Sequence, residues 1–527
     1  MSNELKYLAG RAAAGKLDRR AFMGRAAALG VSGAVANTLF STTALAAGPK
    51  KGGTLKLGLQ GGESTNSLDP ATYASSVPTN FGNTWGETLV EMTPDGSVVN
   101  RLAESVEASA DAKSWRFKIR KGVEFHNGKT MTPDDVKATL ERHSGEDTKS
   151  GALGIMRGID KISVDGDSVV LDLKTANADL PYLMTDYHLL IQPNGGKDDP
   201  AAGIGTGAYK VEVNEPGVRH GGTKFANYWD DGRGHADQVE IVVLNDGTAR
   251  TAALQGGQVH MINRVEPKIA DLLGRAPGLT LQNVSGRGHY VFIMRTQTAP
   301  FDNNDLRLAL KYALDREEMV DKILRGYGSV GNDMPINAAY PLFSDDIPQR
   351  TYDPDKAAFH FKKSGHDGPV TLRTADAAFS GAVDAAQLFQ QSAAKAGITL
   401  DIKREPNDGY WSEVWNKQPF CASYWGGRPV QDQMYSVAYL STADWNDTQF
   451  NDPHFDELLL SARGELDQVK RKDIYREMGT IVRDEGGLIC PMFNDFIDAA
   501  NDKVGGYVKD PNGAMMNGFA LEKAWLL

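Results

Sequence analysis

The stretch that decides the fold runs from residue 102 to residue 136 and reads LAESVEASADAKSWRFKIRKGVEFHNGKTMTPDDV. In WRFKIR (115–120) apolar and basic residues alternate, which predicts a strand with one buried and one solvated face. Asn127-Gly128 is a turn dipeptide. Thr132-Pro133-Asp134-Asp135 is typical of a capped helix start, with Thr at the N-cap, Pro first and acids in the first turn. The stretch therefore predicts strands, turns and a helix in close succession.

The same mixture of strand and helix patterns extends to both sides of this stretch. Apolar alternation or helical periodicity predicts strands at 55–59, 159–164, 168–173, 209–213, 238–244 and 398–402, and helices at 249–255, 306–326, 354–365 and 383–396. We interpret this order as α/β layering in two successive regions. Because no low-complexity linker separates the regions, short crossing strands are expected to join two lobes.

The bulk composition excludes several classes of protein. The chain has 527 residues, 41% of them hydrophobic and 24% charged, which is typical of a soluble globular protein with two large lobes or about three domain-sized units. The formal net charge of −11 argues against nucleic acid and anionic membranes as partners. Beyond the N-terminus no uncharged apolar run is long enough for a membrane span, so membrane insertion is not expected.

The N-terminus has the pattern of an export signal. Arg19-Arg20 is followed two residues later by Phe22, then by a mildly apolar run over 26–40 and by Ala44-Leu45-Ala46. We interpret residues 1–46 as a twin-arginine-type signal peptide cleaved after Ala46, and the mature protein as periplasmic. The alternative is a general secretory signal with a chance Arg pair. The remaining chain would hold 51 basic and 66 acidic residues, a net charge of −15.

Motifs for catalysis or metal binding are weak. Gly326 to Gly331 fits G-x-G-x-x-G but follows a predicted helix instead of a strand, and the loop 122–130 is one residue too long for a phosphate loop. The ten histidines are scattered without zinc spacing, and no G-x-S-x-G elbow occurs. We expect no catalytic residue, no metal and no cofactor. The alternative functional class is a secreted hydrolase. Cys421 and Cys490 either form a disulfide or remain free thiols.

The segments of the chain, in this order, resemble a known family, the family 5 bacterial extracellular solute-binding proteins, which take up peptides, opines, nickel chelates and similar solutes. The stretch 102–136 carries the most specific match. Further matching segments are Gly205-Thr206-Gly207-Ala208-Tyr209, Asn227-Tyr228-Trp229, Ala253 to Gly257, Pro300 to Arg316 and Tyr352-Asp353-Pro354. The resemblance covers nearly all of residues 51–527.

The resemblance implies an α/β periplasmic binding protein of two lobes that close on a ligand. Lobe I would comprise 47–285, with an extra α/β subdomain inserted at about 94–205, and lobe II would comprise 286–493. Residues 494–527 would return to lobe I. The implied protein is a monomer without enzymatic activity, and it delivers a small organic solute to an inner-membrane ABC permease.

The segment 425–434 is expected to contact the ligand. In peptide-binding relatives a strand ending in Trp-Gly leads into a loop whose Asp pairs with the ligand ammonium, which corresponds to Trp425, Gly426, Gly427 and Asp432 here. A charge-assisted bond of this kind is physically reasonable in a dry cleft. The alternative is that Asp432 caps the helix that follows.

Two arginines depart from the family pattern. Arg428 lies in the Trp-Gly loop and is expected to bind a ligand carboxylate through its planar fork. Arg295 ends an apolar run and has two open readings, a ligand contact or a structural ion pair. Tyr73, after the first strand, and Asn494, at the return to lobe I, complete the candidate site. Together these residues predict a zwitterionic ligand such as a peptide or amino-acid derivative, with an opine or an organic amine as alternatives.

Overall fold

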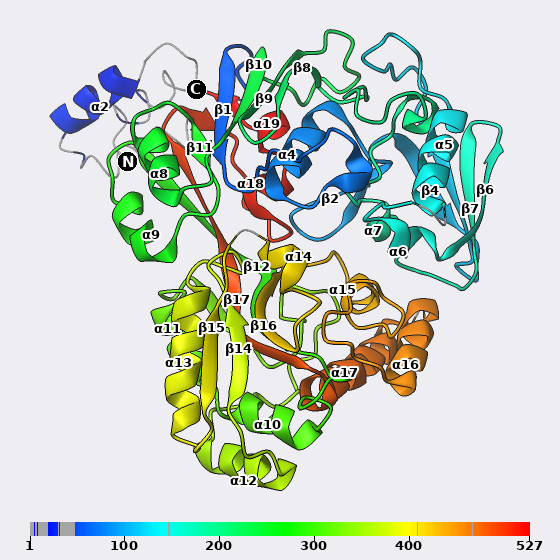
Figure 1. Cartoon of the computed structure of the whole chain (residues 1–527). Coiled ribbons are helices and arrows are strands. Elements are labelled where there is room, and N and C mark those ends of the chain that lie inside the picture. Colours follow the sequence, from blue (N-terminus) through cyan, green and yellow to red (C-terminus); the bar gives the residue numbers. More distant parts are fainter. Residues whose placement is uncertain are drawn as a thin grey trace.

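The computed structural model describes residues 5, 8, 19–29, 31 and 48–527, apart from 146, 147, 408 and 466. Two lobes lie one above the other, with a further α/β unit beside the upper lobe (Figure 1). We call the body built around 54–85, 209–274 and 502–527 lobe I, the unit at 90–200 the subdomain, and the body at 295–487 lobe II. The expected cleavage point at Ala46 lies outside the described residues, whereas the Arg19-Arg20 pair begins helix α2 (Arg19–Ala28).

Lobe I contains one half of a large mixed sheet. Strand β1 pairs in parallel with β10 and β11, and β9 and β8 continue the sheet in antiparallel order. Its elements are β1 (Thr54–Leu59), α4 (Ser76–Trp85), β8 (Tyr209–Glu215), β9 (Arg219–Lys224), β10 (Gln238–Val243), α8 (Gly247–Gln255), β11 (Met261–Ile262), α9 (Pro267–Gly274), β18 (Val504–Gly505), α18 (Ala514–Asn517), α19 (Ala520–Lys523) and β19 (Trp525–Leu526). The core includes Leu55, Leu57, Phe81 and Trp85, all buried.

The subdomain is an antiparallel sheet in the order β4-β5-β7-β6 with helix α5 against it. As predicted, Thr132 is the N-cap of α5, and the two residues of its capping box hold each other: Asp135 N–H donates to Thr132 Oγ1, and Thr132 N–H to Asp135 Oδ2 at 3.0 Å. The elements are β2 (Val90–Met92), β3 (Val98–Asn100), β4 (Ala103–Ala108), β5 (Ser114–Ile119), α5 (Pro133–Ser144), α6 (Leu153–Met156), β6 (Ile159–Asp165), β7 (Ser168–Leu173) and α7 (Leu180–Leu183).

Two antiparallel strands cross from one lobe to the other; crossing strands were expected from the absence of a linker, but they are long, of 16 and 14 residues, instead of short. Strands β12 (Leu279–Met294) and β17 (Leu488–Asn501) pair from Leu279–Asn501 to Ile293–Leu488, with register shifts between Ser285 and His289 and between Tyr290 and Phe292. In Figure 1 both span the passage between the lobes, β12 from lobe I to lobe II and β17 in the opposite direction. The shifts interrupt the ladder near the passage between lobes, where a two-stranded connection bends most easily.

Lobe II packs helices against the other half of the sheet, in the order β15-β14-β16-β12-β17. Its elements are α10 (Asn304–Tyr312), α11 (Arg316–Lys322), β13 (Gly328–Val330), α12 (Pro354–Ser364), β14 (Val370–Thr374), α13 (Ala382–Ala394), β15 (Leu400–Arg404), α14 (Tyr410–Glu413), β16 (Phe420–Trp425), α15 (Gln431–Ala438), α16 (Pro453–Gly464) and α17 (Gln468–Glu485). The prediction of a single helix over 306–326 is wrong, because the segment forms two helices, α10 and α11. Asp315 caps a new helix there and accepts from Glu318 N–H at 3.0 Å.

Candidate functional site

A cavity of about 350 Å³ lies between the subdomain and lobe II. One wall comes from α6, α7 and the loops around them, and the other from the loop after β16, helix α15, the segment 440–445 and Arg463. In Figure 1 these subdomain helices lie above α15 and α16. The volume is within the range of small-molecule sites, about 300–1,000 Å³. The cavity is therefore the candidate ligand site.

Arg428 lines this cavity from lobe II. Its Nη1 donates to the carbonyl oxygens of Gly426 at 3.1 Å and Gly427 at 3.2 Å, and its guanidinium lies over the Trp425 ring at 5.8 Å. Its backbone N–H donates to the Tyr340 hydroxyl at 3.1 Å. Among the described residues the guanidinium forms no ion pair, although its charge helps to lower the pKa of the Asp186 carboxyl. Its hydrogen-bonding groups therefore remain available to a ligand.

Gly427 permits the close approach of this loop to the crossing strand β12. A Cβ at Gly427 would lie 2.1 Å from the Cβ of Arg287 and 3.1 Å from its backbone. A side chain at this position would therefore push the Arg428 loop away from β12. Gly426 has no comparable neighbour and is exposed. The two glycines thus shape the loop and offer its carbonyls, while Arg428 supplies the charge.

Asp432 also lines the cavity, but its carboxylate already has a partner. Arg463 Nε on α16 donates to Asp432 Oδ1 at 2.9 Å, and Arg463 Nη2 donates to Ser436 Oγ at 2.6 Å. The alternative of Asp432 as a helix cap is wrong, because the N-cap of α15 is Val430 and Asp432 lies in the first helical turn. Asp432 is thus a buried, charge-paired member of the cavity wall.

Trp425 lies behind the wall and belongs to a cluster of tryptophans. It is buried, and its indole N–H donates to Asp447 Oδ2 at 3.1 Å, as does that of Trp415 at 2.8 Å. Trp445 contacts both rings and reaches the cavity. Burial raises the pKa of the Asp447 carboxyl to about 7, although the two indole N–H groups partly counteract this. The hydrogen bond to Asp447 and the neighbouring tryptophans hold the Trp425 ring in place 5.8 Å from the Arg428 guanidinium.

The subdomain wall carries a buried His–Asp contact that the sequence analysis did not predict. His188 Nδ1 lies 2.6 Å from Asp186 Oδ1, and His188 Nε2 lies 2.8 Å from the Tyr73 carbonyl oxygen. Burial pushes the pKa of Asp186 up, but the hydrogen bonds and charge of His188, together with the charge of Arg428, hold this pKa below its usual value. The Asp-x-His spacing at 186–188 was the available sequence signal. No local sequence signal indicated the pairing of Arg463 with Asp432, since the two residues lie 31 positions apart in the chain.

The two sides of the cavity touch each other beyond it. Arg471 on α17 binds Asp179 in the subdomain, with Nη1 donating to Oδ1 at 3.1 Å and Nη2 to Oδ2 and to the Tyr475 hydroxyl. The backbone N–H of Ala178 donates to the Arg463 carbonyl at 3.2 Å. At the exposed rim Arg157 pairs with Asp444 at 3.2 Å. These bonds hold the subdomain and lobe II together around the cavity.

Of the expected site residues only Arg428 and Asp432 belong to the cavity lining. Trp425, Gly426 and Gly427 precede Arg428 in the same segment, and the other three lie elsewhere. Tyr73 is buried in lobe I, where its hydroxyl donates to the Leu68 carbonyl at 3.2 Å. Asn494 lies on β17, opposite Gly328, and donates to the Asp495 carbonyl at 3.3 Å. Arg295 follows the end of β12, and its Nη1 donates to the Lys417 carbonyl at 2.8 Å instead of a carboxylate. The structure therefore brings Arg428 and Asp432 together and keeps these three apart from them.

The cysteines and the charged side chains form no further site in the described part of the chain. Cys421 and Cys490 are both buried free thiols, so the disulfide alternative is wrong. No group of three or more His, Cys, Asp or Glu side chains suited to a metal ion occurs among the described residues. None of the helices described is long and apolar enough to span a bilayer.

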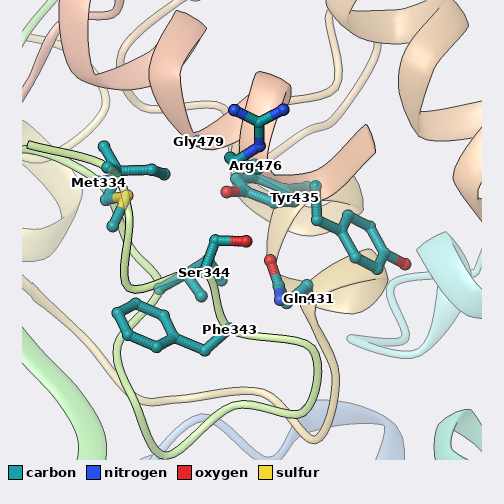
Figure 2. A pocket seen from close by; sticks show the side chains of 10 residues that line it. Met334, Phe343, Ser344, Gln431, Tyr435, Arg476 and Gly479 are labelled. Carbon is teal, nitrogen blue, oxygen red and sulfur yellow. The ribbon is translucent and has the colours of Figure 1, made fainter. Parts of the chain in front are cut away.

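A second, much smaller cavity lies inside lobe II. Figure 2 shows Ser344, Gln431, Tyr435 and Gly479 around it. Its volume is about 10 Å³, which is room for about one water molecule. The hydroxyls of Ser344 and Tyr435 are buried without a partner among the described residues, as expected beside a water position. It is too small for an organic ligand.

The family model described as "Bacterial extracellular solute-binding proteins, family 5 Middle" matches residues 97–447. The chain belongs to this family of solute-binding proteins. The match covers the subdomain, the crossing strand β12 and most of lobe II, including both Arg428 and Asp432. Members of the family are binding proteins of ABC transport systems, not enzymes, which confirms the expected class and removes the hydrolase alternative.

Similar proteins agree with this assignment. A glutathione-binding protein of Salmonella choleraesuis is 27% identical over 88% of this chain and 93% of its own. The heme-binding protein A of Haemophilus influenzae is 26% identical over 78% and 82%. The solved periplasmic binding protein AgaA of A. tumefaciens, bound to agropinic acid, is 26% identical with a TM-score of 0.80, over 90% of this solute-binding protein and 99% of that chain. The predicted two-lobed fold is confirmed.

Proposed function

We propose that the solute of this binding protein is a small zwitterionic organic molecule, held in the cavity between the subdomain and lobe II. Arg428 binds an acidic group of the solute, and the Asp432 carboxylate, which Arg463 orients, accepts its ammonium group. The protein acts as a monomer, and delivery to the partner permease follows when the lobes open. The single observation that carries this proposal is the Arg428 guanidinium, which lines the cavity with only carbonyl and ring partners among the described residues.

The relatives favour peptide-like or opine-like solutes. One relative binds glutathione, and one solved neighbour binds agropinic acid, both at about one quarter identity over most of this chain. An opine is thus a second candidate solute, supported by the AgaA likeness. A simple organic amine is disfavoured because it has no acidic group for Arg428.

A thermal-shift screen of the mature protein against amino acids, di- and tripeptides, opines and amines tests this proposal. A solute present at about 100 times its dissociation constant adds about 2.7 kcal/mol to the free energy of unfolding. We expect one zwitterionic class to raise the melting temperature and to return chemically unchanged after incubation. A screen in which no solute shifts the melting temperature would contradict the proposal.

We further propose that residues 1–46 are a twin-arginine signal and that the mature protein works in the periplasm. The support is the Arg19-Arg20 pair followed by Phe22, the mild apolar run and the Ala44-Leu45-Ala46 pattern. The double substitution Arg19→Lys, Arg20→Lys is expected to retain the precursor in the cytoplasm, measured by fractionation and immunoblot. Undiminished periplasmic protein would instead indicate the general secretory route.

A further inference from the structure

The charges of the cavity wall fall into pairs, with two cations left over. Two ion pairs and one hydrogen-bonded contact account for six of the lining side chains: Arg463 with Asp432 at 2.9 Å, Arg157 with Asp444 at 3.2 Å, and the His188 Nδ1–Asp186 Oδ1 contact at 2.6 Å. Each acidic side chain of the described lining therefore has a basic partner within the same lining. The two cations that remain are Arg428 and Lys174.

These two cations come from opposite walls. Arg428 stands in the lobe II loop, and Lys174 directly follows β7 in the subdomain. The ammonium group of Lys174 has no hydrogen-bond or ion-pair partner in the part of the chain that the structure describes, and the residue is exposed. Arg428 has only two loop carbonyls and the Trp425 ring. Both charges are thus free to meet groups of a bound solute.

The two unpaired cations give the cavity lining an excess of positive charge, whereas the whole protein is negatively charged. The chain carries a formal net charge of −11, so a positive cavity stands out against its surroundings. A charge without a partner is costly in the enclosed cavity, more for the half-buried Arg428 than for the exposed Lys174. A solute that neutralises both cations removes this cost, whereas a solute of zero net charge leaves one of them unpaired.

We infer that the solute carries a net negative charge, with one acidic group at Arg428 and a second at Lys174. The inference deepens the proposed function and rests on it. If the solute also has an ammonium group, it is an acidic zwitterion with two acidic groups. Lys174 is then a specificity-determining residue of the subdomain wall, which selects acidic solutes over their neutral isosteres.

Isothermal titration calorimetry with charge-matched probes tests the inference. The probes are Ala-Glu against Ala-Gln and glutarate against glutaramate, since each pair differs by one acidic group at nearly constant size. We expect the acidic member to bind at least about tenfold more tightly, a preference of about 1.4 kcal/mol. Raising the salt concentration is expected to reduce this preference, because it screens the charges.

Two variants locate the preference. Lys174→Gln is expected to reduce it to below about threefold, mainly by weakening the binding of the acidic member. Lys161→Gln removes an exposed lysine of the same subdomain, on β6 outside the cavity lining, and is expected to retain the full preference. Both positions are exposed, so melting temperatures near that of the wild type are expected and serve as the folding control.

The outcomes separate the inference from the proposed function. The inference would be overturned by equal affinity for both members of each pair, or by a solute screen whose tightest ligand is neutral or cationic. The proposed function as a solute receptor would remain. A preference that Lys174→Gln leaves intact would overturn the role of Lys174. A protein that no solute stabilises would overturn the proposed function itself.

Discussion

Arg428 is the residue whose replacement should affect binding most cleanly. Arg428→Gln removes the charge and the planar fork, so the solute's acidic group is left without its partner in the closed cavity. We expect affinity to fall by about 30-fold or more, equivalent to about 2 kcal/mol, by calorimetry with the solute found in the screen. Because the guanidinium contacts only its own loop and the Trp425 ring, the ligand-free melting temperature should change little.

Arg428→Lys is the matched control that separates the charge of the side chain from its bidentate geometry. Lysine keeps the charge but cannot form the bidentate contact, so an intermediate loss of affinity is expected. Wild-type affinity in Arg428→Gln would remove this residue from the site.

Asp447 is expected to make stability depend on pH. Its folded pKa of about 7 lies above the ordinary value, so the folded protein binds a proton that the unfolded chain has lost between about pH 4 and 7. The groups that face it are the indoles of Trp415 and Trp425 and the buried Cys421 and Tyr439, without an ion-pair partner among the described residues. The stabilisation from Asp447 is therefore present at low pH and is lost as pH rises through 7.

Comparison of the wild type with Asp447→Asn isolates this contribution, because the pH-dependent contributions of the other titrating groups are the same in both proteins and cancel in the difference. The free energy of unfolding of the wild type, relative to the variant, should fall by up to about 1.4 kcal/mol per pH unit between pH 5 and 7, measured by urea denaturation. Above pH 8 the difference should be constant. A difference that stays flat across pH 5–8 would show that Asp447 titrates normally.

At the scale of elements, helix α5 tests the local account of the subdomain. Thr132→Ala removes the N-cap oxygen of the capping box, while Asp135 keeps its bonds from Lys129 Nζ and Asn194 N–H, both at 2.7 Å. We expect a loss of about 1 kcal/mol in the free energy of unfolding, without a change in solute affinity. Thr132→Ser retains the oxygen and should restore most of the loss. An unchanged stability in Thr132→Ala would contradict the capping account.

Most elements were predictable because their signals are local. The alternation in 115–120 and the Thr132 cap act within a few residues, and both appear in the structure as expected. The break between α10 and α11 was missed, although Asp315 is a favoured cap residue, because the apolar spacing continues across it. For the site, the sequence indicated that Arg428 and Asp432 belong together. It did not indicate their partners, since Arg463 and the subdomain wall reach the cavity only through tertiary packing.

At the scale of the whole molecule, the Asp179–Arg471 pair should favour closure. This pair joins the subdomain to lobe II beside the cavity, and both residues are buried. Asp179→Asn leaves the Arg471 charge without its counter-ion in the closed form, whereas opening returns that charge to water. We expect a loss of affinity of about tenfold or more, and a solute-saturated protein that small-angle X-ray scattering finds more extended than the wild type.

Arg116→Ala is the control for this prediction, since it breaks the exposed pair with Asp165 at 2.6 Å on the subdomain surface. An exposed pair contributes little, so affinity and dimensions should stay as in the wild type. If Asp179→Asn bound as tightly as the wild type, the pair would have no role in closure.

Native mass spectrometry of the mature protein, purified from the periplasm without denaturation, tests the central claim most directly. We expect the wild type to carry one noncovalent small molecule per chain, which dissociates on activation and ionises as an acid. Arg428→Gln purified in parallel should be occupied to a much smaller extent. A wild-type protein that holds no small molecule even after incubation with the solute library would contradict the account, as would equal occupancy in Arg428→Gln.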